Sequence, residues 1–271
     1  MSFPTHIIPE GFETITLAEM SEVRLMNRTD SKYLANVSKI GEVLKHAVPF
    51  YYIQRIDGVA PAHYGTRYFD TDDLFFYREH HNRRLCRQKV RVRSYLDSLL
   101  SFLEVKNKNN KGKTQKLRIR VEEELPERFD QEDSVHFLEE IVPFSAGALH
   151  PSLDNEFYRI TLVNKEKTER ITMDFDLRFK NVRTGYSYHL PQIVVIEIKQ
   201  DGNLSSRMQQ LLLEARIPRK SFSKYCMGIV LTDPFVKQNR FKPKERYLER
   251  LCHESGCGCS SPEPTLLSNR V

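Results

Sequence analysis

Charged and apolar residues alternate along several segments of this chain, and the alternation predicts β-strands with one charged face and one apolar face. The pattern is densest at residues 87–93, where every odd position is a cation and Val90 and Val92 occupy even positions. An amphipathic antiparallel sheet with one face in water explains the alternation. It does not explain a face of cations alone, because like charges 4 Å apart repel by about 4 kcal/mol at an effective dielectric near 20.

The same alternation returns at residues 102–106, 117–122, 170–178 and 195–199. Several of these segments pair an acid with a base, so both signs of charge share one face. We therefore expect the charged faces to converge on the inside of a closed barrel that holds a polyanion and a metal ion. The apolar faces would turn outward against helices, which helical apolar stripes predict at 131–141 and 204–215. Residues 223–231 are predicted to form the final core strand.

The formal net charge of +6 favours an acidic partner: nucleic acid, an anionic membrane surface or a phosphorylated small molecule. We expect no nucleic acid, because carboxylates interleaved with the cations weaken a footprint on a phosphate backbone, and no aromatic stacking ladder accompanies the basic strands. We expect no membrane segment, since no apolar run approaches the length of a span. The N-terminus lacks a basic start followed by an apolar stretch, so a cytoplasmic location is predicted.

Short motifs follow one another over most of the chain: residues 28–33, 66–71 with Tyr77, 87–93, 104–106, 158–159, 170–174, 197–199 and 222–225. No single motif is specific, but their order and spacing are. Together they resemble the polyphosphate polymerase domain of the vacuolar transporter chaperone (VTC) family, within the CYTH and triphosphate tunnel metalloenzyme superfamily.

The resemblance implies an α+β fold built on a closed, eight-stranded antiparallel β-barrel with surrounding helices, in which basic walls grip the triphosphate of a nucleotide. It implies an N-terminal extension at 1–20, a VTC/CYTH-like tunnel domain at 21–250 and a tail at 251–271. The tail is rich in Ser, Gly and Pro and contains three cysteines, and we expect it to be disordered. A metal clip with His253 is the alternative, although the spacing matches no zinc pattern.

By the same resemblance, a set of basic residues would contact phosphate and one carboxylate, Glu197, would hold Mn²⁺ or Mg²⁺. The residues expected to act in catalysis are Arg91, Arg93, Lys106, Arg159, Arg170 and Lys199. Those expected to bind substrate are Lys32, Arg67, Lys89, Arg118 and Lys224.

The residues themselves favour the same types of contact. The planar guanidinium groups of Arg91 and Arg93 suit phosphate oxygens, although an exposed basic face is the alternative. Glu197 lies in an apolar segment where an uncompensated carboxylate would cost several kcal/mol, and it either binds a hard cation or pairs with Lys199. We expect Asp174 and Asp176 to lie together on the charged face. There each would form a structural ion pair or support a residue that contacts the ligand.

We therefore expect an ATP-dependent polyphosphate polymerase that moves the γ-phosphoryl group of ATP onto a growing polyphosphate chain. A hydrolase of inorganic or organic triphosphates is one alternative. A non-catalytic sensor of polyphosphate or nucleotide is the other. The residues suit Mn²⁺ and Mg²⁺ equally and specify no protein partner.

Overall fold

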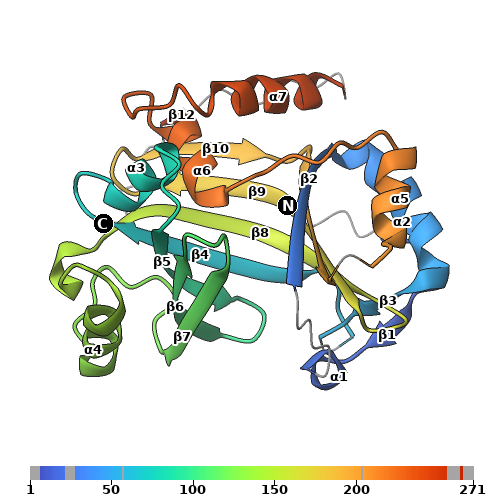
Figure 1. Cartoon of the computed structure of the whole chain (residues 1–271), viewed down its shortest axis with the longest axis horizontal. Helices are drawn as coiled ribbons and strands as arrows, with labels where there is room; N and C mark the ends of the chain where they lie inside the picture. The colour runs from blue at the N-terminus through green and yellow to red at the C-terminus, as the bar shows by residue number, and fades with distance from the viewer. Residues whose placement is uncertain (1–6, 22–27, 57, 203, 255–262, 265–271) are drawn as a thin grey trace, which may run out of the picture.

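The computed structural model describes residues 7–21, 28–56, 58–202, 204–254 and 263–264 (Figure 1). All twelve described strands belong to one extended sheet, and the helices lie around it. The strands are β1 (Glu13–Ile15), β2 (Arg28–Asn36), β3 (Tyr51–Gln54), β4 (Ala62–Asp70), β5 (Arg87–Tyr95), β6 (Leu100–Lys108), β7 (Thr114–Val121), β8 (His150–Asn164), β9 (Glu169–Asn181), β10 (Tyr186–Leu190), β11 (Ile193–Asp201) and β12 (Glu263–Pro264). The helices are α1 (Leu17–Ser21), α2 (Ile40–Ala47), α3 (Phe75–His81), α4 (Glu132–Ile141), α5 (Arg207–Glu214), α6 (Lys224–Thr232) and α7 (Lys242–His253).

The sheet is open, so the predicted closed, eight-stranded barrel is wrong. The sheet contains 12 strands, and its longest path runs in the order β12-β10-β9-β8-β4-β5-β6-β7. Within the described residues, β7 pairs only with β6, and β2 pairs only with β11. The free side of β2 instead meets the segment after α5, through a bridge between Tyr33 and Arg219 and a hydrogen bond from the Lys220 N–H to the Lys32 carbonyl oxygen.

The strand pairs are antiparallel except for β1 and β3, which pair in parallel. The sheet branches at two strands: β8 pairs with β3, β4 and β9, and β9 pairs with β8, β10 and β11. The register places Lys89 of β5 opposite Lys106 of β6, and Lys106 opposite Lys116 of β7. Side chains that the sequence separates therefore share one face of the sheet.

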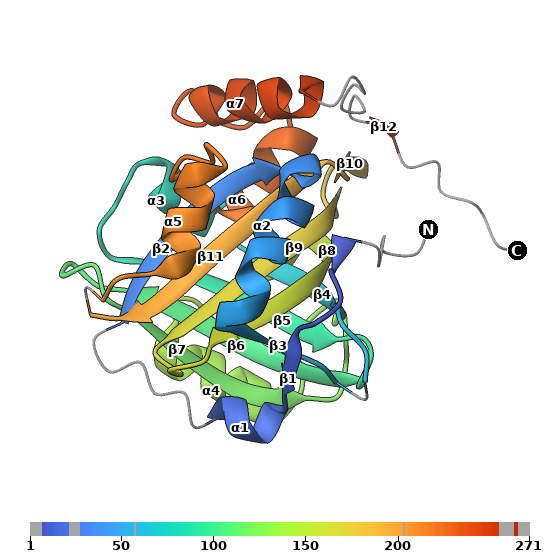
Figure 2. The same ribbon diagram turned by 90° about the vertical axis from the view of Figure 1, so that its right-hand side faces the viewer.

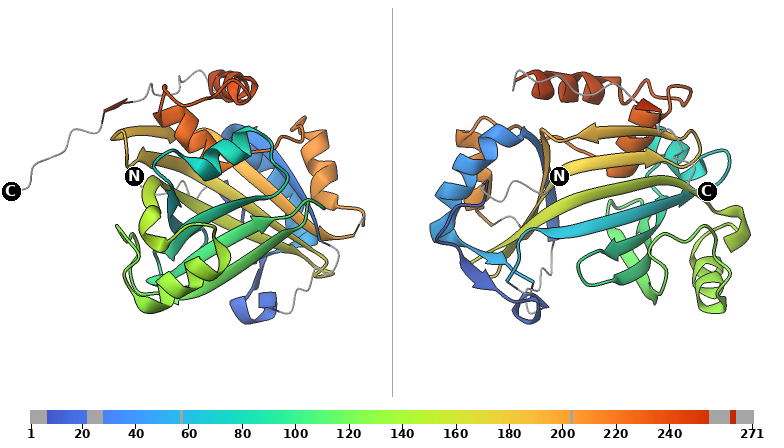
Figure 3. Two further views of the ribbon diagram at one scale, coloured as in Figure 1. Left: turned by 60° about the vertical axis from the view of Figure 1, so that its left-hand side comes forward. Right: turned by 180° about the vertical axis from the view of Figure 1, so that it is seen from behind.

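The apolar faces of the strands pack against helices, as the alternation predicts. Val90, Val92 and Leu103 form one core cluster with Leu138 of α4, which lies beside β5–β7 in Figure 3. A second cluster joins α2 and α5 to β8, β9 and β11, and Figure 2 shows these two helices side by side over the strands. The predicted helices at 131–141 and 204–215 correspond to α4 and α5.

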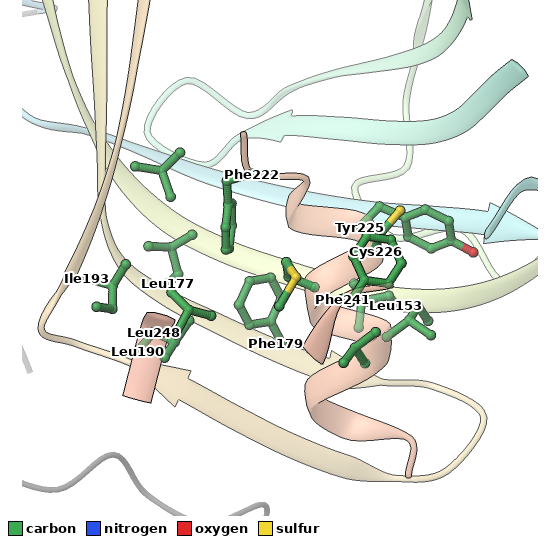
Figure 4. Packing of buried hydrophobic residues seen from close by; sticks show 14 of the residues in the cluster. Leu153, Leu177, Phe179, Leu190, Ile193, Phe222, Tyr225, Cys226, Phe241 and Leu248 are labelled. Carbon is green, nitrogen blue, oxygen red and sulfur yellow. The ribbon is translucent and has the colours of Figure 1, made fainter. Parts of the chain in front are cut away.

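Helix α6 packs against the opposite face of the sheet, where the sequence predicted a final strand at 223–231. Phe222 and Tyr225 form a buried cluster with Leu153 and Phe179, as Figure 4 shows. A short continuous apolar run is typical both of a buried strand and of a buried helix, which is why the sequence pattern misassigned it. Ser223 caps the helix, because its hydroxyl accepts a hydrogen bond from the Cys226 N–H.

Helix α7 extends to His253, across the start of the predicted tail at 251. Residues 255–262 and 265–271 of that tail lie outside the described residues. Among the described helices, none is long and apolar enough to cross a membrane.

Candidate functional site

One face of the sheet, on the side away from α2, α4 and α5, gathers charged side chains from β2, β5, β6, β7, β8, β9 and β11, and from the first residue of α6. We call this set the charged face. Its cations outnumber its carboxylates. Its members are Lys32, Lys89, Arg91, Arg93, Glu104, Lys106, Lys116, Arg118, Arg159, Arg170, Asp174, Glu197, Lys199 and Lys224.

Asp174 joins two cations from different elements. Arg159 donates from Nε to Oδ1 at 2.5 Å and from Nη2 to Oδ2 at 2.9 Å, and Lys224 of α6 donates to the same carboxylate. Phe157 and Tyr64 are stacked beneath them with ring centroids 5.4 Å apart. The Lys224 Nζ lies 4.1 Å from the centroid of Phe157, which adds a cation–π contact. Although burial opposes it, Arg159 and Lys224 lower the pKa of Asp174, so its carboxyl stays ionised.

Glu104 joins two cations in the same way. Arg91 donates from Nε and Nη2 to Oε2 at 2.8 and 2.5 Å, and the Lys116 Nζ lies 3.0 Å from Oε1. The side chain of Glu104 is buried, and the burial opposes ionisation. Arg91, Arg93 and Lys116 nevertheless hold its pKa well below the usual range.

Glu197 of β11 is the third carboxylate of the charged face. Its Oε1 lies 3.0 Å from the Lys32 Nζ, and its Oε2 lies 3.8 Å from the Lys199 Nζ. Burial again opposes ionisation, but Lys32 and Lys199 lower the pKa of Glu197 well below its ordinary value. Its side chain is 19% exposed, so the carboxylate is accessible from the charged face.

Arg93 and Lys106 form no ion pair with a carboxylate among the described residues. The Arg93 Nε is buried without a hydrogen-bond partner, and burial together with Arg91 and Arg159 lowers the pKa of this guanidinium to about 10. Arg91, then burial, lowers the pKa of Lys106 well below its ordinary value. Repulsion from neighbouring arginines contributes to both lowered pKa values, which shows that Arg93 and Lys106 lie among other cations. An anion bound here would supply the missing charge.

The lysines at the edge of this cluster are affected similarly. Burial lowers the pKa of Lys89 and of Lys199 to about 8, and that of Lys224 to about 7. The Lys89 Nζ donates a 2.9 Å hydrogen bond to the Ser223 hydroxyl, the same group that caps α6. A serine directly before a helix is a common N-cap, so the sequence could have suggested that Ser223 caps α6. Nothing in the sequence pattern indicated that Lys89 contacts Ser223.

The structure brings together all the predicted site residues except Arg67. Arg67 lies on the other face of β4, where it pairs with Asp154 at 2.8 Å and Glu127 at 2.6 Å. Arg118 lies on the charged face at β7 with its guanidinium 4.7 Å from the centroid of Phe102. Arg170 lies opposite Lys199 in the β9–β11 register. Sequence reasoning missed the aromatic floor formed by Tyr64 and Phe157, although Phe157 directly precedes the motif at 158–159.

Asp176 does not share a face with Asp174, contrary to expectation. The β8–β9 register shifts between Glu156 and Tyr158, and Asp176 has a φ of 51°. One extra residue in β9 therefore turns the following side chains over. Asp176 pairs with Arg178 at 3.0 Å and His189 at 2.5 Å on the opposite face.

A resident metal cage is not formed by the charged face. In the described part of the chain, no group of three or more His, Cys, Asp and Glu side chains could hold a metal ion. Glu197 is ionised, partly exposed and only loosely paired with Lys199, so its oxygens suit a hard divalent cation whose other ligands are phosphate oxygens and water. The residues thus fit a metal that arrives with a phosphate ligand.

Comparison with known proteins identifies a family for most of the chain. The family model described as the VTC domain matches residues 27–232. A solved structure of a Hippeastrum protein, described as revealing a dominant triphosphatase activity, is 14% identical with a TM-score of 0.46, covering 76% of this chain and 96% of that one. The PH1012 protein of Pyrococcus horikoshii is 9% identical with a TM-score of 0.36, covering 88% of this chain and 96% of that one. No curated protein sequence matches the chain.

Proposed function

Because this chain belongs to the VTC domain family, we propose that it is a metal-dependent polyphosphate polymerase that uses ATP. Family membership favours chemistry on polyphosphate or triphosphate. The finer assignment, transfer of the γ-phosphoryl group of ATP to a growing polyphosphate chain, is the one that we propose. The observation that supports it best is the uncompensated positive charge around Arg93 and Lys106.

Phosphoryl transfer passes through a loose transition state, which needs positioning and charge stabilisation more than covalent help from the protein. In our proposal Arg91, Arg93, Arg159 and Arg170 bind the triphosphate. Lys106, Lys199 and Lys224 stabilise the negative charge that develops on the leaving oxygen. A terminal oxygen of the acceptor chain forms the new bond to the γ-phosphorus, and the bond from that phosphorus to the β–γ bridging oxygen breaks to release ADP.

The role of Asp174 and Glu104 in this proposal is to position cations rather than to contact phosphate. Each carboxylate already accepts two hydrogen bonds from an arginine and one from a lysine. Asp174 binds Arg159 and Lys224. Glu104 binds Arg91 and Lys116. Glu197 would hold the divalent ion, which when bound neutralises part of the charge on the phosphate oxygens. Lys32 would then neutralise the Glu197 oxygen that the ion does not take.

The direct test is to incubate the purified protein with ATP and either Mn²⁺ or Mg²⁺ and to separate the products by gel electrophoresis. We expect phosphate chains longer than triphosphate and release of ADP. Release of free phosphate from tripolyphosphate without elongation would instead identify a triphosphatase. Tight binding of polyphosphate with no turnover of either substrate would identify a sensor.

A further inference from the structure

A cavity of about 140 Å³ lies between the edge of β2, helix α7 and the segment that follows α5. Leu34 and Ala35 of β2 both line it, and they turn to opposite faces of the strand, so the cavity wraps around the strand edge. Four buried apolar side chains form its floor: Leu34, Ala35, Ile217 and Leu251. An apolar cavity of roughly 150 Å³ admits benzene. This cavity therefore has room for one six-membered ring.

Two contacts fix the walls of the cavity. The Asn36 Nδ2 donates a 2.7 Å hydrogen bond to the Leu251 carbonyl oxygen of α7, which passes over the end of β2 in Figure 1. The Lys39 Nζ lies 3.5 Å from an Oε2 of Glu254, just after α7. Among the described residues that line the cavity, Glu254 is the only carboxylate, and Lys39 neutralises it.

Two arginines at the rim of the cavity have no counterion. Arg216 and Arg250 are exposed, and within the described part of the chain neither forms an ion pair. The Arg250 guanidinium lies 5.0 Å from the ring centroid of Tyr247, which also lines the cavity. With Lys39 paired to Glu254, the lining carries two uncompensated positive charges.

Arg216 occupies a backbone position that favours glycine. Its φ is 55°, and the Ile217 N–H bonds back to the Leu212 carbonyl oxygen, which closes the end of α5. Glycine is the usual residue at such a helix end, because a Cβ crowds the backbone in the left-handed region. Strained residues cluster at ligand-binding sites. The end of the helix alone gives no reason for an arginine here, whereas a ligand in the cavity does.

We propose that this cavity binds a small organic phosphate monoester, with an apolar ring on the floor and the phosphate between Arg216 and Arg250. A phosphate monoester carries nearly two negative charges at pH 7, which matches the two uncompensated cations. Guanidinium groups also suit phosphate oxygens geometrically. The inference does not depend on the proposed function, because no residue of the charged face lines the cavity.

The test uses phenyl phosphate as the probe, with inorganic phosphate as the ligand that lacks the ring and phenol as the ligand that lacks the charge. Each is titrated into the full chain while NMR follows the methyl groups of Ala35, Ile217 and Leu251, which report on the cavity alone. The cavity variant combines Arg216→Gly with Arg250→Gln. The control combines Arg183→Gln with Arg240→Gln, which removes the same charge from exposed positions outside the cavity.

We expect phenyl phosphate to shift these methyl signals and to bind at least about tenfold more tightly than either smaller ligand. Affinity should fall about tenfold in the cavity variant and stay unchanged in the control. Arg216→Gly alone should also weaken binding while the Tm rises by about 2 °C, because glycine relieves the backbone strain. A residue kept for stability alone would show no loss of binding.

The inference is wrong if phenyl phosphate leaves the cavity methyl signals unshifted, or if the control loses as much affinity as the cavity variant. Inorganic phosphate that binds as tightly as phenyl phosphate would indicate a general anion surface and would equally overturn it. Normal binding by Arg216→Gly would remove the arginine from the site. Each of these results leaves the proposed function standing, because the charged face takes no part in the readout.

Discussion

Arg159 holds Asp174 through two nearly parallel hydrogen bonds, and the Arg159 guanidinium lies 5.1 Å from the centroid of Tyr64 and 5.3 Å from that of Phe157. Asp174 therefore holds the Nε and Nη2 side of the Arg159 guanidinium in place and stabilises its buried positive charge. This arrangement leads to the first prediction.

Replacing Asp174 by Asn should lower the free energy of unfolding by about 3 kcal/mol, because the buried charges of Arg159 and Lys224 lose their counterion. Tripolyphosphate should recover much of this loss by supplying oxygens in place of the carboxylate. The measurement is thermal unfolding with and without tripolyphosphate. Asp176→Asn, on the opposite face, should cost about 1 kcal/mol or less and show the wild-type ligand response. Identical ligand responses in the two variants would contradict a positioning role for Asp174.

Arg93→Gln should weaken the binding of tripolyphosphate by about tenfold to a hundredfold, the value of a charge-assisted hydrogen bond. The free energy of unfolding should stay constant or rise, because the substitution removes a buried cation that Arg91 and Arg159 repel. Calorimetric binding and chemical denaturation measure the two effects. Arg178→Gln on the opposite face, where Arg178 pairs with Asp176, should leave affinity unchanged. A destabilised Arg93 variant with normal affinity would point to a purely structural arginine.

Affinity for polyphosphate should fall between about pH 7 and about pH 9, as Lys224, with a pKa of about 7, and Lys89 and Lys199, each about 8, lose their protons. These lysines have lower pKa values in the folded protein than in the unfolded chain, where the value is 10.5. The unfolded chain therefore binds more protons in this range, and the contribution of these lysines to the unfolding free energy rises with pH. Binding isotherms and denaturation curves across the range should show opposite trends. An affinity that is independent of pH would contradict the lowered pKa values.

Glu197→Gln should abolish turnover of ATP while tripolyphosphate still binds in the absence of metal. The substitution removes the charge that would hold a divalent ion but leaves the surrounding cations, and Lys32 loses its partner. Turnover is followed with ATP and Mn²⁺, and binding by calorimetry in a chelator. Glu156→Gln, which affects an exposed pair with His63, is the matched control. Full activity in Glu197→Gln would exclude it as the metal ligand.

Gly228→Ala should destabilise the protein by about 1–3 kcal/mol through overpacking. A Cβ at Gly228 of α6 would lie 2.4 Å from Leu153 Cδ2 and 2.6 Å from Phe179 Cδ1. Because Lys224 begins the same helix, we also expect weaker tripolyphosphate binding. Gly41→Ala in α2, where a Cβ would meet nothing within 4 Å, should instead stabilise by about 0.5–1 kcal/mol. Denaturation curves of the two variants decide the comparison.

The faces of the strands were predictable because a period of two is imposed by backbone geometry alone. Val90 and Val92 pack towards α4, while Arg91 and Arg93 take the other side. The same rule gave the wrong face for Asp176. The bulge there arises from the pairing of β8 with β9, and the alternation of residues along β9 does not reveal it. Arg67 was misjudged in a related way, since the motif at 66–71 does not show which face its arginine takes.

Closure of the sheet could not be derived from the residues of any one strand. Whether β2 meets β7 depends on what else competes for the edge of β2, and here the competitor is the segment at Arg219 and Lys220. The helical structure of residues 224–232 also depends on distant parts of the chain. Their apolar side chains pack against Leu153 and Phe179, which lie on other elements. The roles that we assign to the charged residues stay predictions until the variants are measured.

In the described part of the chain no strand pairs with the outer edge of β7, and this bears on how a polymer would reach the charged face. A closed barrel admits a polymer only when a free end of the polymer is threaded through it. An open sheet edge can instead be approached from the side by any internal segment of the polymer. If the chain binds polyphosphate as we propose, a cyclic phosphate polymer, or one with both termini chemically blocked, should therefore associate as readily as a linear one, even though it offers no terminus to extend.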